Sequence, residues 1–335
     1  MKRAIITGVS GQDGTLLSRF LCSQGTKVLG LHRGNFPKQI VAGMENQENL
    51  TLVKVRDYLD KNLQHIIQDF KPDYIYALHG NSFPKSAQIT KRDFIIDPVM
   101  EFLYHMEILS TLTKKVKYLL CASSEIFASE SVGLLDETTQ VGPRNSYGLG
   151  KLNLLSAGKY FRDFEGEHIY SAILFPHESE YRRDDFVIMK LIESFTGVHN
   201  RDAEPLIFGD LSSSRDFGSG KDYVKWMSML VESGLPGDYC FATGVNTRID
   251  SIIDLIAEIM GIELERRETG GKIEFASKLD PKKIYVISKP ANSEFSNYTY
   301  PAGQNKKLFK EIGVQEITDM RDWIGEMIAA KTSIV

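Results

Sequence analysis

A tyrosine and a lysine one helical turn apart are the residues of this chain best suited to chemistry. Tyr147 and Lys151 lie in the run NSYGLGK at residues 145–151. On a helix, side chains four positions apart share one face. A tyrosine phenol ordinarily has a pKa of about 10 and is a poor base, but a nearby lysine and a cationic nicotinamide would stabilise its phenolate. The pair alone also fits a solvated helix face, so its interpretation depends on the sequence around it.

Two further candidates precede this pair. Ser123 and Glu125 directly follow the apolar run 118–121, which has the composition of a buried strand. Ligands of parallel α/β sheets bind beyond the carboxyl ends of the strands. Ser123 could therefore hydrogen-bond a substrate hydroxyl that Tyr147 deprotonates, and Glu125 could serve as a second acid or base. Such residues in loops are often only solvated or capping, but together with the Tyr-Lys pair they predict catalysis.

A glycine-rich turn near the start predicts the cofactor site. The run GVSGQDG at residues 8–14 follows the strand-like run 4–7 and precedes a helical pattern over 16–21. Glycines three apart permit a tight turn and close approach of the backbone to a pyrophosphate, which the helix N-terminus attracts. The alternative is a turn without a ligand. We expect a dinucleotide bound by Gly8, Ser10, Gly11, Gln12, Asp13 and Gly14, with contacts from Tyr147 and Lys151.

The end of the second predicted strand indicates which dinucleotide. The strand-like run 27–31 is followed by His32, Arg33 and Gly34, without a carboxylate. NAD binders usually place an acidic residue there for the ribose hydroxyl, whereas an arginine accommodates the 2′-phosphate of NADP. NADP is therefore favoured over NAD, with Arg33 as its anchor. Asp57 is a candidate for the adenine end, although a turn or helix-capping role fits it equally well.

Alternating strand and helix patterns fill the first half of the chain. Further strands are predicted at 73–78 and 118–121, with a long helix over about 94–113 between them. This order predicts a Rossmann-like, doubly wound parallel sheet of the α/β class. We expect residues 1–175 to form the cofactor domain. Residues 176–335 should form a smaller, interwoven C-terminal α/β substrate lobe, with about 206–245 returning to the first domain.

The composition is that of an ordinary globular enzyme. The 335 residues are 42% hydrophobic and 25% charged, with a net charge of −4 and no dense basic run, so no nucleic-acid partner is expected. No apolar stretch has the length of a membrane span or of a signal peptide's core. Cys22, Cys121 and Cys240 are far apart in apolar surroundings. We expect them to be reduced packing residues in a cytoplasmic protein without a metal site.

These motifs together resemble the extended short-chain dehydrogenase/reductase family, and within it the GDP-mannose 4,6-dehydratases. The resemblance is carried by Ser123, Tyr147 and Lys151 and by three runs, TGVSGQDG at 7–14, LFPHES at 174–179 and RDFGSGKDYV at 215–224. It implies conversion of GDP-mannose or a related GDP-sugar to a 4-keto-6-deoxy sugar, by internal hydride transfer through NADP. Tyr147 would deprotonate the 4-hydroxyl, and Glu125 would remove the C5 proton and assist loss of the C6 hydroxyl. A nucleotide-sugar reductase or epimerase of the same family remains the alternative.

The resemblance also implies a substrate site in the later half of the chain. Basic side chains would bind the diphosphate, because guanidinium groups make bidentate bonds to phosphate oxygens. For the candidate arginines a solvated loop is the alternative, and His177 is expected to pack rather than to catalyse. The cations considered for the diphosphate are Arg215, Lys190 and either Arg182 or Arg183. Glu178 and Ser82 are further candidates for contact with the substrate.

Several positions depart from the family pattern. Pro176 stands in place of an asparagine, Phe102 and Leu103 replace a small Gly-Thr pair, and Lys289 and Asn292 stand where an arginine and a glutamate would hold the nucleotide. These changes predict a divergent dehydratase acting on an unusual sugar nucleotide, such as a modified mannose or a heptose. Gly34 replaces a basic residue of a loop that reaches a neighbouring subunit in relatives. A homodimer is therefore expected, with a tetramer as the alternative.

Overall fold

The chain divides into two compact units. A computed structural model describes the chain except residues 35, 37–39, 41–43, 45–46, 81–89, 129–130, 202, 210, 212, 289–299, 315 and 334–335. The first unit comprises Met1–Phe175, Gly220–Ala242 and Gly303–Glu316, and the second comprises Pro176–Ser219, Thr243–Ala302 and Ile317–Val335. Of the segment 206–245, residues 206–219 and 243–245 group with the second unit and residues 220–242 with the first.

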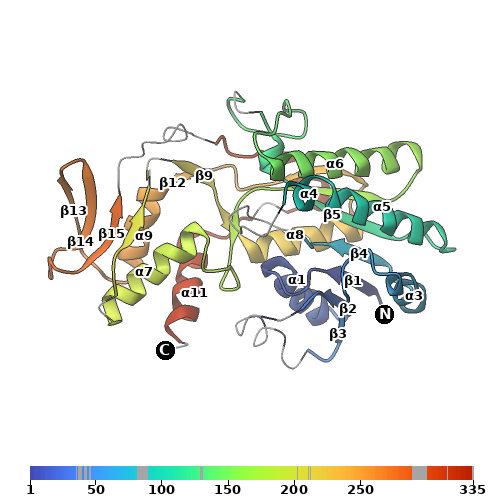
Figure 1. Ribbon diagram of the computed structural model, residues 1–335, viewed down its shortest axis with the longest axis horizontal. Coiled ribbons are helices and arrows are strands. Elements are labelled where there is room, and N and C mark those ends of the chain that lie inside the picture. Colours follow the sequence, from blue (N-terminus) through green and yellow to red (C-terminus); the bar gives the residue numbers. More distant parts are fainter. Residues whose placement is uncertain are drawn as a thin grey trace. The chain divides into compact units, whose positions relative to one another are not determined.

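A seven-stranded parallel sheet forms the centre of the first unit (Figure 1). Its spatial order is β11-β6-β5-β4-β1-β2-β3, and every neighbouring pair runs parallel. The order reverses direction at β1 and β4, which is where doubly wound sheets bind ligands. The predicted α/β fold class is confirmed. The strands are β1 Arg3–Thr7, β2 Lys27–His32, β3 Leu50–Lys54, β4 Tyr74–Ala77, β5 Lys117–Ser123, β6 Ile169–Leu174 and β11 Gly237–Phe241.

Helices cover both faces of this sheet, as the parallel connections require. α1 packs beside α8 on one face, whereas α5 and α6 pack together on the other (Figure 1). Side chains of α3 and α5 share a core with the sheet, centred on buried residues such as Ile67, Phe102 and Tyr118. The helices are α1 Gln12–Ser23, α3 Asn62–Phe70, α4 Lys91–Ile95, α5 Asp97–Ser110, the 3-10 turn η1 Ser124–Ile126, α6 Ser146–Phe164, α8 Gly220–Ser233 and α10 Lys306–Ile312.

The single long helix predicted over about 94–113 is wrong. The segment forms two helices, α4 ending at Ile95 and α5 beginning at Asp97, with Pro98 in the first turn of α5. Proline lacks a backbone donor and disfavours helical geometry in the preceding residue, so it ends one helix and suits the start of another. Phe102 lies on α5, is buried, and contacts Tyr118 and Phe161 edge to face.

The second unit is built on a four-stranded sheet in the order β13-β14-β15-β8. β13, β14 and β15 are antiparallel neighbours and β8 joins parallel to β15. Apolar side chains of α7, α9 and α11 form one buried cluster with this sheet. Its elements are β7 His177–Glu178, α7 Val187–Arg201, β8 Leu206–Phe208, β9 Ser214–Asp216, β10 Gly218–Ser219, β12 Asn246–Arg248, α9 Ile249–Ile259, β13 Leu264–Thr269, β14 Lys272–Ser277, β15 Ile284–Ser288 and α11 Met320–Thr332.

Within the described part of the chain, no helix has both the length and the apolarity to cross a bilayer.

Candidate active site

The glycine turn joins β1 to α1 as the sequence predicts. Gly8 has a φ of +69°, a region that glycine enters without steric cost. A Cβ at Gly8 would lie 2.8 Å from the Cα of His79, and one at Gly14 would lie 2.4 Å from the carbonyl oxygen of Gly8. The helix begins at Gln12 with Gly11 as its N-cap. Gly8 and Gly14 therefore let the turn pack closely against the neighbouring backbone. The turn leads into the N-terminus of α1, and a helix N-terminus is a favourable place for a phosphate.

Beyond β2 and β3 lie the two residues predicted to contact the cofactor's adenosine. Arg33 is exposed, and its guanidinium carbon lies 5.6 Å from the ring centroid of Tyr58. The carboxylate of Asp57 accepts a hydrogen bond from the backbone N–H of Leu59 at 2.9 Å and pairs with Arg56. This bond stabilises a local turn, which is the alternative role that the sequence suggested for Asp57. Its contact with adenine stays a prediction.

Two of the four predicted catalytic residues come from the carboxyl end of β5. Ser123 is buried, and its hydroxyl accepts the backbone N–H of Glu125 at 3.3 Å, so it caps η1. Glu125 is half-buried within η1. The strand thus delivers a hydroxyl and a carboxylate to the edge of the sheet where ligands of such folds bind.

The other two come from the first turns of α6. Lys151 donates from Nζ to the carbonyl oxygen of Cys121 at 2.8 Å, and Nζ lies 5.8 Å from the ring centroid of Tyr147. Because Cys121 belongs to β5, this bond joins α6 to the strand that carries Ser123. The helix and the bond to Cys121 thus hold the ammonium of Lys151 near the phenol ring of Tyr147.

Asn145 connects the two pairs, and the sequence reading did not select it. Its side-chain oxygen accepts the backbone N–H of Gly148 at 2.8 Å, which caps α6. Its amide nitrogen donates to Oε2 of Glu125 at 3.1 Å. An asparagine directly before a helical pattern is an N-cap signal, so the cap could have been predicted. The bond to Glu125 could not, because it depends on where η1 lies.

Close packing around α6 fixes its position relative to η1 and α4. A Cβ at Gly148 would lie 2.3 Å from the carbonyl oxygen of Glu125, and one at Gly150 would lie 1.7 Å from that of Phe94. The ring of Phe94 meets Tyr147 edge to face, with centroids 6.2 Å apart. The two glycines thus allow η1 and α4 to lie directly against the helix that carries Tyr147 and Lys151.

The described residues predicted to bind substrate belong to the second unit. Arg215 in β9 donates to the carbonyl oxygen of Ser214 at 2.8 Å, and its guanidinium carbon lies 3.4 Å from the ring centroid of Tyr300. Glu178 in β7 is buried and pairs with Arg182 at 3.2 Å. Lys190 is half-buried in the first turn of α7.

The remaining residues singled out for the substrate either pack or lie outside the described chain. Arg183 pairs with Asp185, and His177 is buried in the short strand β7. Ser82, Lys289 and Asn292 lie outside the described residues.

Comparison with known proteins identifies the family of the chain. A family model described as GDP-mannose 4,6 dehydratase matches residues 5–327. The GDP-mannose 4,6-dehydratase of Vibrio cholerae serotype O1 is 30% identical over 98% of this chain and 93% of its own.

Solved structures share the fold at low sequence identity. The UDP-glucuronic acid 4-epimerase of Bacillus cereus, in complex with UDP-glucuronic acid and NAD, superposes with a TM-score of 0.79 at 16% identity, covering 99% of this chain and all of its own. RMD from Pseudomonas aeruginosa, complexed with NADPH, superposes with a TM-score of 0.73 at 19% identity over the full length of both chains. With the family model spanning nearly the whole sequence, the chain belongs to the GDP-mannose 4,6-dehydratase family.

Proposed function

We propose that this protein is a nucleotide-sugar 4,6-dehydratase that converts GDP-mannose, or a related GDP-sugar, to its 4-keto-6-deoxy form. The observation that carries the proposal is the hydrogen bond from Asn145 to Glu125. It joins an acid/base carboxylate to the helix that presents Tyr147 and Lys151. A redox pair alone would serve any member of the wider family, whereas a carboxylate held beside it supplies the base that an elimination needs.

We propose NADP as the cofactor, bound on the glycine turn. The turn suits a diphosphate because it leads into the N-terminus of α1, and the exposed Arg33 offers a cation to a 2′-phosphate. Bound there, NADP would supply the hydride acceptor and donor that an internal redox dehydration of a sugar requires. The residues assigned to it are Gly8, Ser10, Gly11, Gln12, Asp13, Gly14, Arg33, Asp57, Tyr147 and Lys151.

The catalytic residues then have distinct tasks. Tyr147, as the phenolate, takes the proton of the sugar's 4-hydroxyl, and Lys151 stabilises that phenolate electrostatically. Ser123 hydrogen-bonds the same oxygen and orients it. Once C4 is a ketone, the C5 proton is acidic, and Glu125 removes it and protonates the departing C6 hydroxyl. Asn145 holds Oε2 of Glu125, so Oε1 is the oxygen assigned to the proton transfers.

The second unit supplies the substrate's anchors in this proposal. Arg215 and Lys190 bind the diphosphate through charge-assisted bonds, and Glu178, which pairs with Arg182, also contacts the substrate. Ser82, which belongs to the first unit, is assigned to the sugar. The departures from the family pattern at Pro176 and at Phe102 fit a modified mannose or a heptose as well as GDP-mannose itself. A screen of nucleotide sugars, monitored by mass, would therefore include both classes.

Loss of one water without net consumption of cofactor is the test. The purified protein, given GDP-mannose and a catalytic amount of NADP, should yield a product lighter by one water, and Glu125→Gln should reduce that rate at least a hundredfold. Stoichiometric consumption of NADPH with a keto-sugar, or an isomer of unchanged mass, would instead identify a reductase or an epimerase. Wild-type turnover by Glu125→Gln would remove the elimination mechanism.

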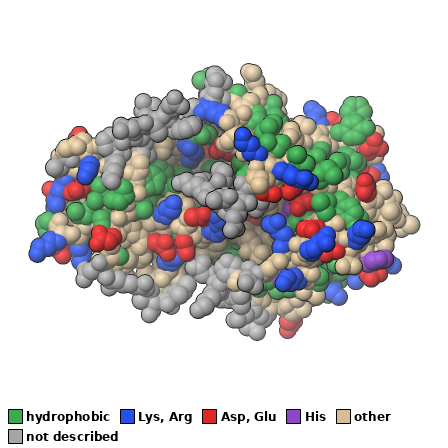
Figure 2. Space-filling model, in the orientation of Figure 1, with side chains coloured by type: hydrophobic (Ala, Val, Ile, Leu, Met, Phe, Trp, Pro, Cys, Tyr) green, Lys and Arg blue, Asp and Glu red, His purple; other side chains and the backbone are tan. Residues whose placement is uncertain are grey.

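A homodimer is proposed on the exposed apolar surface of α5 and α6. Met100 and Ile96 are each 47% exposed at α5, and Phe164 is 78% exposed at the end of α6. Figure 2 shows hydrophobic side chains on this part of the surface. Exposed large apolar side chains on two helices that pack together favour association. Light scattering after gel filtration would distinguish a dimer from a monomer or tetramer.

Localisation in the cytoplasm stays a prediction.

A further inference from the structure

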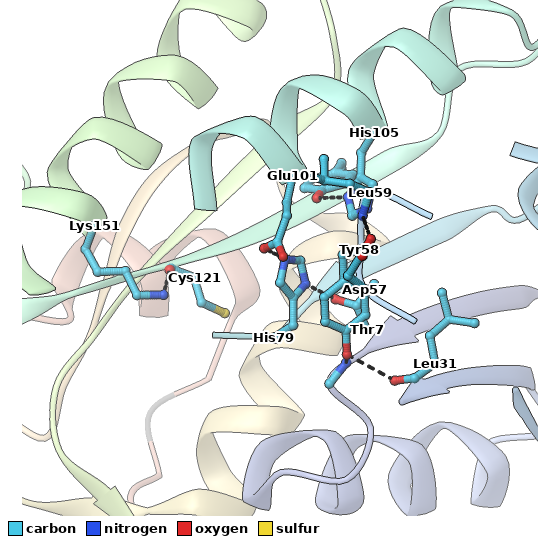
Figure 3. A network of polar contacts seen from close by, with 12 residues as sticks. Thr7, Leu31, Asp57, Tyr58, Leu59, His79, Glu101, His105, Cys121 and Lys151 are labelled. Carbon is cyan, nitrogen blue, oxygen red and sulfur yellow. Dashed lines mark hydrogen bonds and ion pairs between the residues drawn. The ribbon is translucent and has the colours of Figure 1, made fainter. Parts of the chain in front are cut away.

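A cluster of polar side chains lies beneath the glycine turn, and the proposed chemistry does not use it. Its members are Thr7, Tyr58, His79, Glu101 and His105, drawn in Figure 3. Thr7, Tyr58 and His105 are at most 2% exposed, and the side chains of His79 and Glu101 are 8% and 13% exposed. Burying so many polar groups is unfavourable unless each is hydrogen-bonded. The bonds they make therefore indicate what the cluster holds in place.

Tyr58 contacts the turn directly. Its hydroxyl oxygen accepts the backbone N–H of Gly8 at 2.8 Å and lies 3.4 Å from the carbonyl oxygen of Leu31. Burial raises the pKa of Tyr58 to about 12. The group is thus a neutral phenol at physiological pH, able to accept from Gly8 and donate to Leu31 at once. The N–H of Gly8 also donates directly to the carbonyl oxygen of Leu31 at 3.1 Å. The hydroxyl of Tyr58 therefore reinforces the link between the first glycine of the turn and the end of β2.

The ring of Tyr58 lies between the cluster and the adenosine end of the site. The His79 ring stacks on it with centroids 4.0 Å apart and planes 29° apart. The guanidinium carbon of Arg33 lies 5.6 Å from the same ring, within range of a cation–π contact. A single aromatic side chain thus contacts both the support beneath the turn and the cation proposed for the 2′-phosphate.

His79 is itself fixed through both ring nitrogens. Nδ1 is hydrogen-bonded with the hydroxyl of Thr7, and Nε2 lies 2.8 Å from Oε2 of Glu101 (Figure 3). Its ring also meets His105 edge to face at 5.8 Å. An imidazole held at both nitrogens cannot rotate without breaking a buried bond. It therefore fixes the plane against which Tyr58 stacks.

We propose that Tyr58 is a positioning residue for the adenosine half of the cofactor, with the His79–Glu101 pair as its support. The hydroxyl holds Gly8, and so acts on the diphosphate that NAD and NADP share. The ring holds Arg33, and so acts only on the 2′-phosphate of NADP. This inference rests on the proposed cofactor function. Because the hydroxyl and the ring of Tyr58 act on different parts of the cofactor, substitutions can separate their contributions.

Direct binding measurements on the full chain test it. The dissociation constants of NADPH and NADH would be measured by fluorescence for the wild type, Tyr58→Phe and Tyr58→Leu, alongside the melting temperature of each. Tyr58→Phe loses only the hydroxyl, so both constants should rise by the same factor, roughly tenfold, and their ratio should hold. Tyr58→Leu also loses the ring, so the dissociation constant of NADPH should rise by a further factor of roughly five relative to that of NADH.

Matched variants separate positioning from general stability. Tyr160→Phe and His65→Gln alter exposed residues of the same types and should bind both cofactors as the wild type does. Glu101→Gln keeps the shape of the support but weakens its charge-assisted bond, and should raise both dissociation constants roughly threefold even if Tyr58→Leu does not fold.

The outcomes distinguish the inference from the function beneath it. If the wild type binds neither cofactor, the proposed function fails. If it binds NADPH, but Tyr58→Phe and Glu101→Gln bind both cofactors within twofold of it, the positioning role of Tyr58 is overturned. An unchanged NADPH-to-NADH ratio in a folded Tyr58→Leu variant would overturn the contact with Arg33 as a determinant of specificity.

Discussion

The side-chain amide of Asn145 donates to Oε2 of Glu125 at 3.1 Å, while its oxygen accepts the backbone N–H of Gly148. One side chain thereby caps the catalytic helix and orients the carboxylate proposed to remove the C5 proton. The two functions can be separated by substitution. Asn145→Ser keeps an oxygen that can cap the helix, whereas Asn145→Ala keeps neither function.

We expect Asn145→Ser to lower kcat for loss of water by roughly tenfold while leaving the melting temperature close to that of the wild type. Asn145→Ala should lower kcat similarly and also reduce the free energy of unfolding by about 1 kcal/mol, because the cap is lost. Product mass analysis and thermal unfolding measure the two effects. Wild-type kcat in the serine variant would mean that Asn145 serves only the helix.

Tyr147→Phe should abolish the first redox step. Without the phenolate, the 4-hydroxyl keeps its proton, and we expect kcat to fall by roughly a thousandfold with little change in stability, since Tyr147 is only half-buried. The reduced nicotinamide absorbance, followed in single turnovers, reports the step directly. Tyr104→Phe is a control at a tyrosine outside the site. Retained hydride transfer in Tyr147→Phe would assign the base to another group.

Gly150 and Gly325 provide a matched pair of helical glycines. A Cβ at Gly150 would lie 1.7 Å from the carbonyl oxygen of Phe94, whereas one at Gly325 in α11 meets no atom within 4 Å. Gly325→Ala should raise the free energy of unfolding by up to about 1 kcal/mol, the gain in helix propensity. Gly150→Ala should lower it by about 2 kcal/mol and reduce activity, because α4 must move. Chemical denaturation measures the free energy of unfolding of both variants. Equal changes in the two would show that α4 can move away from Gly150 without cost.

His105 should make the protein acid-sensitive. Burial, with the nearby His79, lowers the pKa of His105 to about 3, whereas the unfolded chain titrates near the ordinary value of about 6.5. As the pH falls below about 6.5, His105 binds a proton in the unfolded state but not in the folded state, so the free energy of unfolding decreases. Between pH 7 and pH 5, the titration of His105 should lower the free energy of unfolding by about 2 kcal/mol.

That contribution is measured as a difference between variants. In urea denaturation, His105→Gln should lose about 2 kcal/mol less than the wild type between pH 7 and 5. His65→Gln, at an exposed position, should keep the wild-type slope. The same slope in all three proteins would show that His105 accepts a proton in the folded state.

Much of the fold could be predicted from local pattern. The apolar runs at 4–7, 27–31, 73–78 and 118–121 form β1, β2, β4 and β5, because a buried parallel strand needs a short apolar segment with turns at its ends. The helix predicted over 94–113 failed because Pro98 interrupts an otherwise helical pattern. The spatial order of the strands could not be read from any one segment, since pairing joins residues far apart in the chain.

Local patterns in the sequence specify the residue types and the short spacings of the candidate site. The glycine turn at 8–14 and the Tyr147–Lys151 pair are local patterns whose geometry follows from one turn or one helix. The tertiary structure alone decided which distant groups meet them, namely Asn145 with Glu125, Lys151 with the carbonyl of Cys121, and Tyr58 with Gly8. These partners lie on separate elements whose carboxyl ends or termini converge at one edge of a parallel sheet. That convergence depends on the packing of the whole sheet and its helices, which no local spacing records.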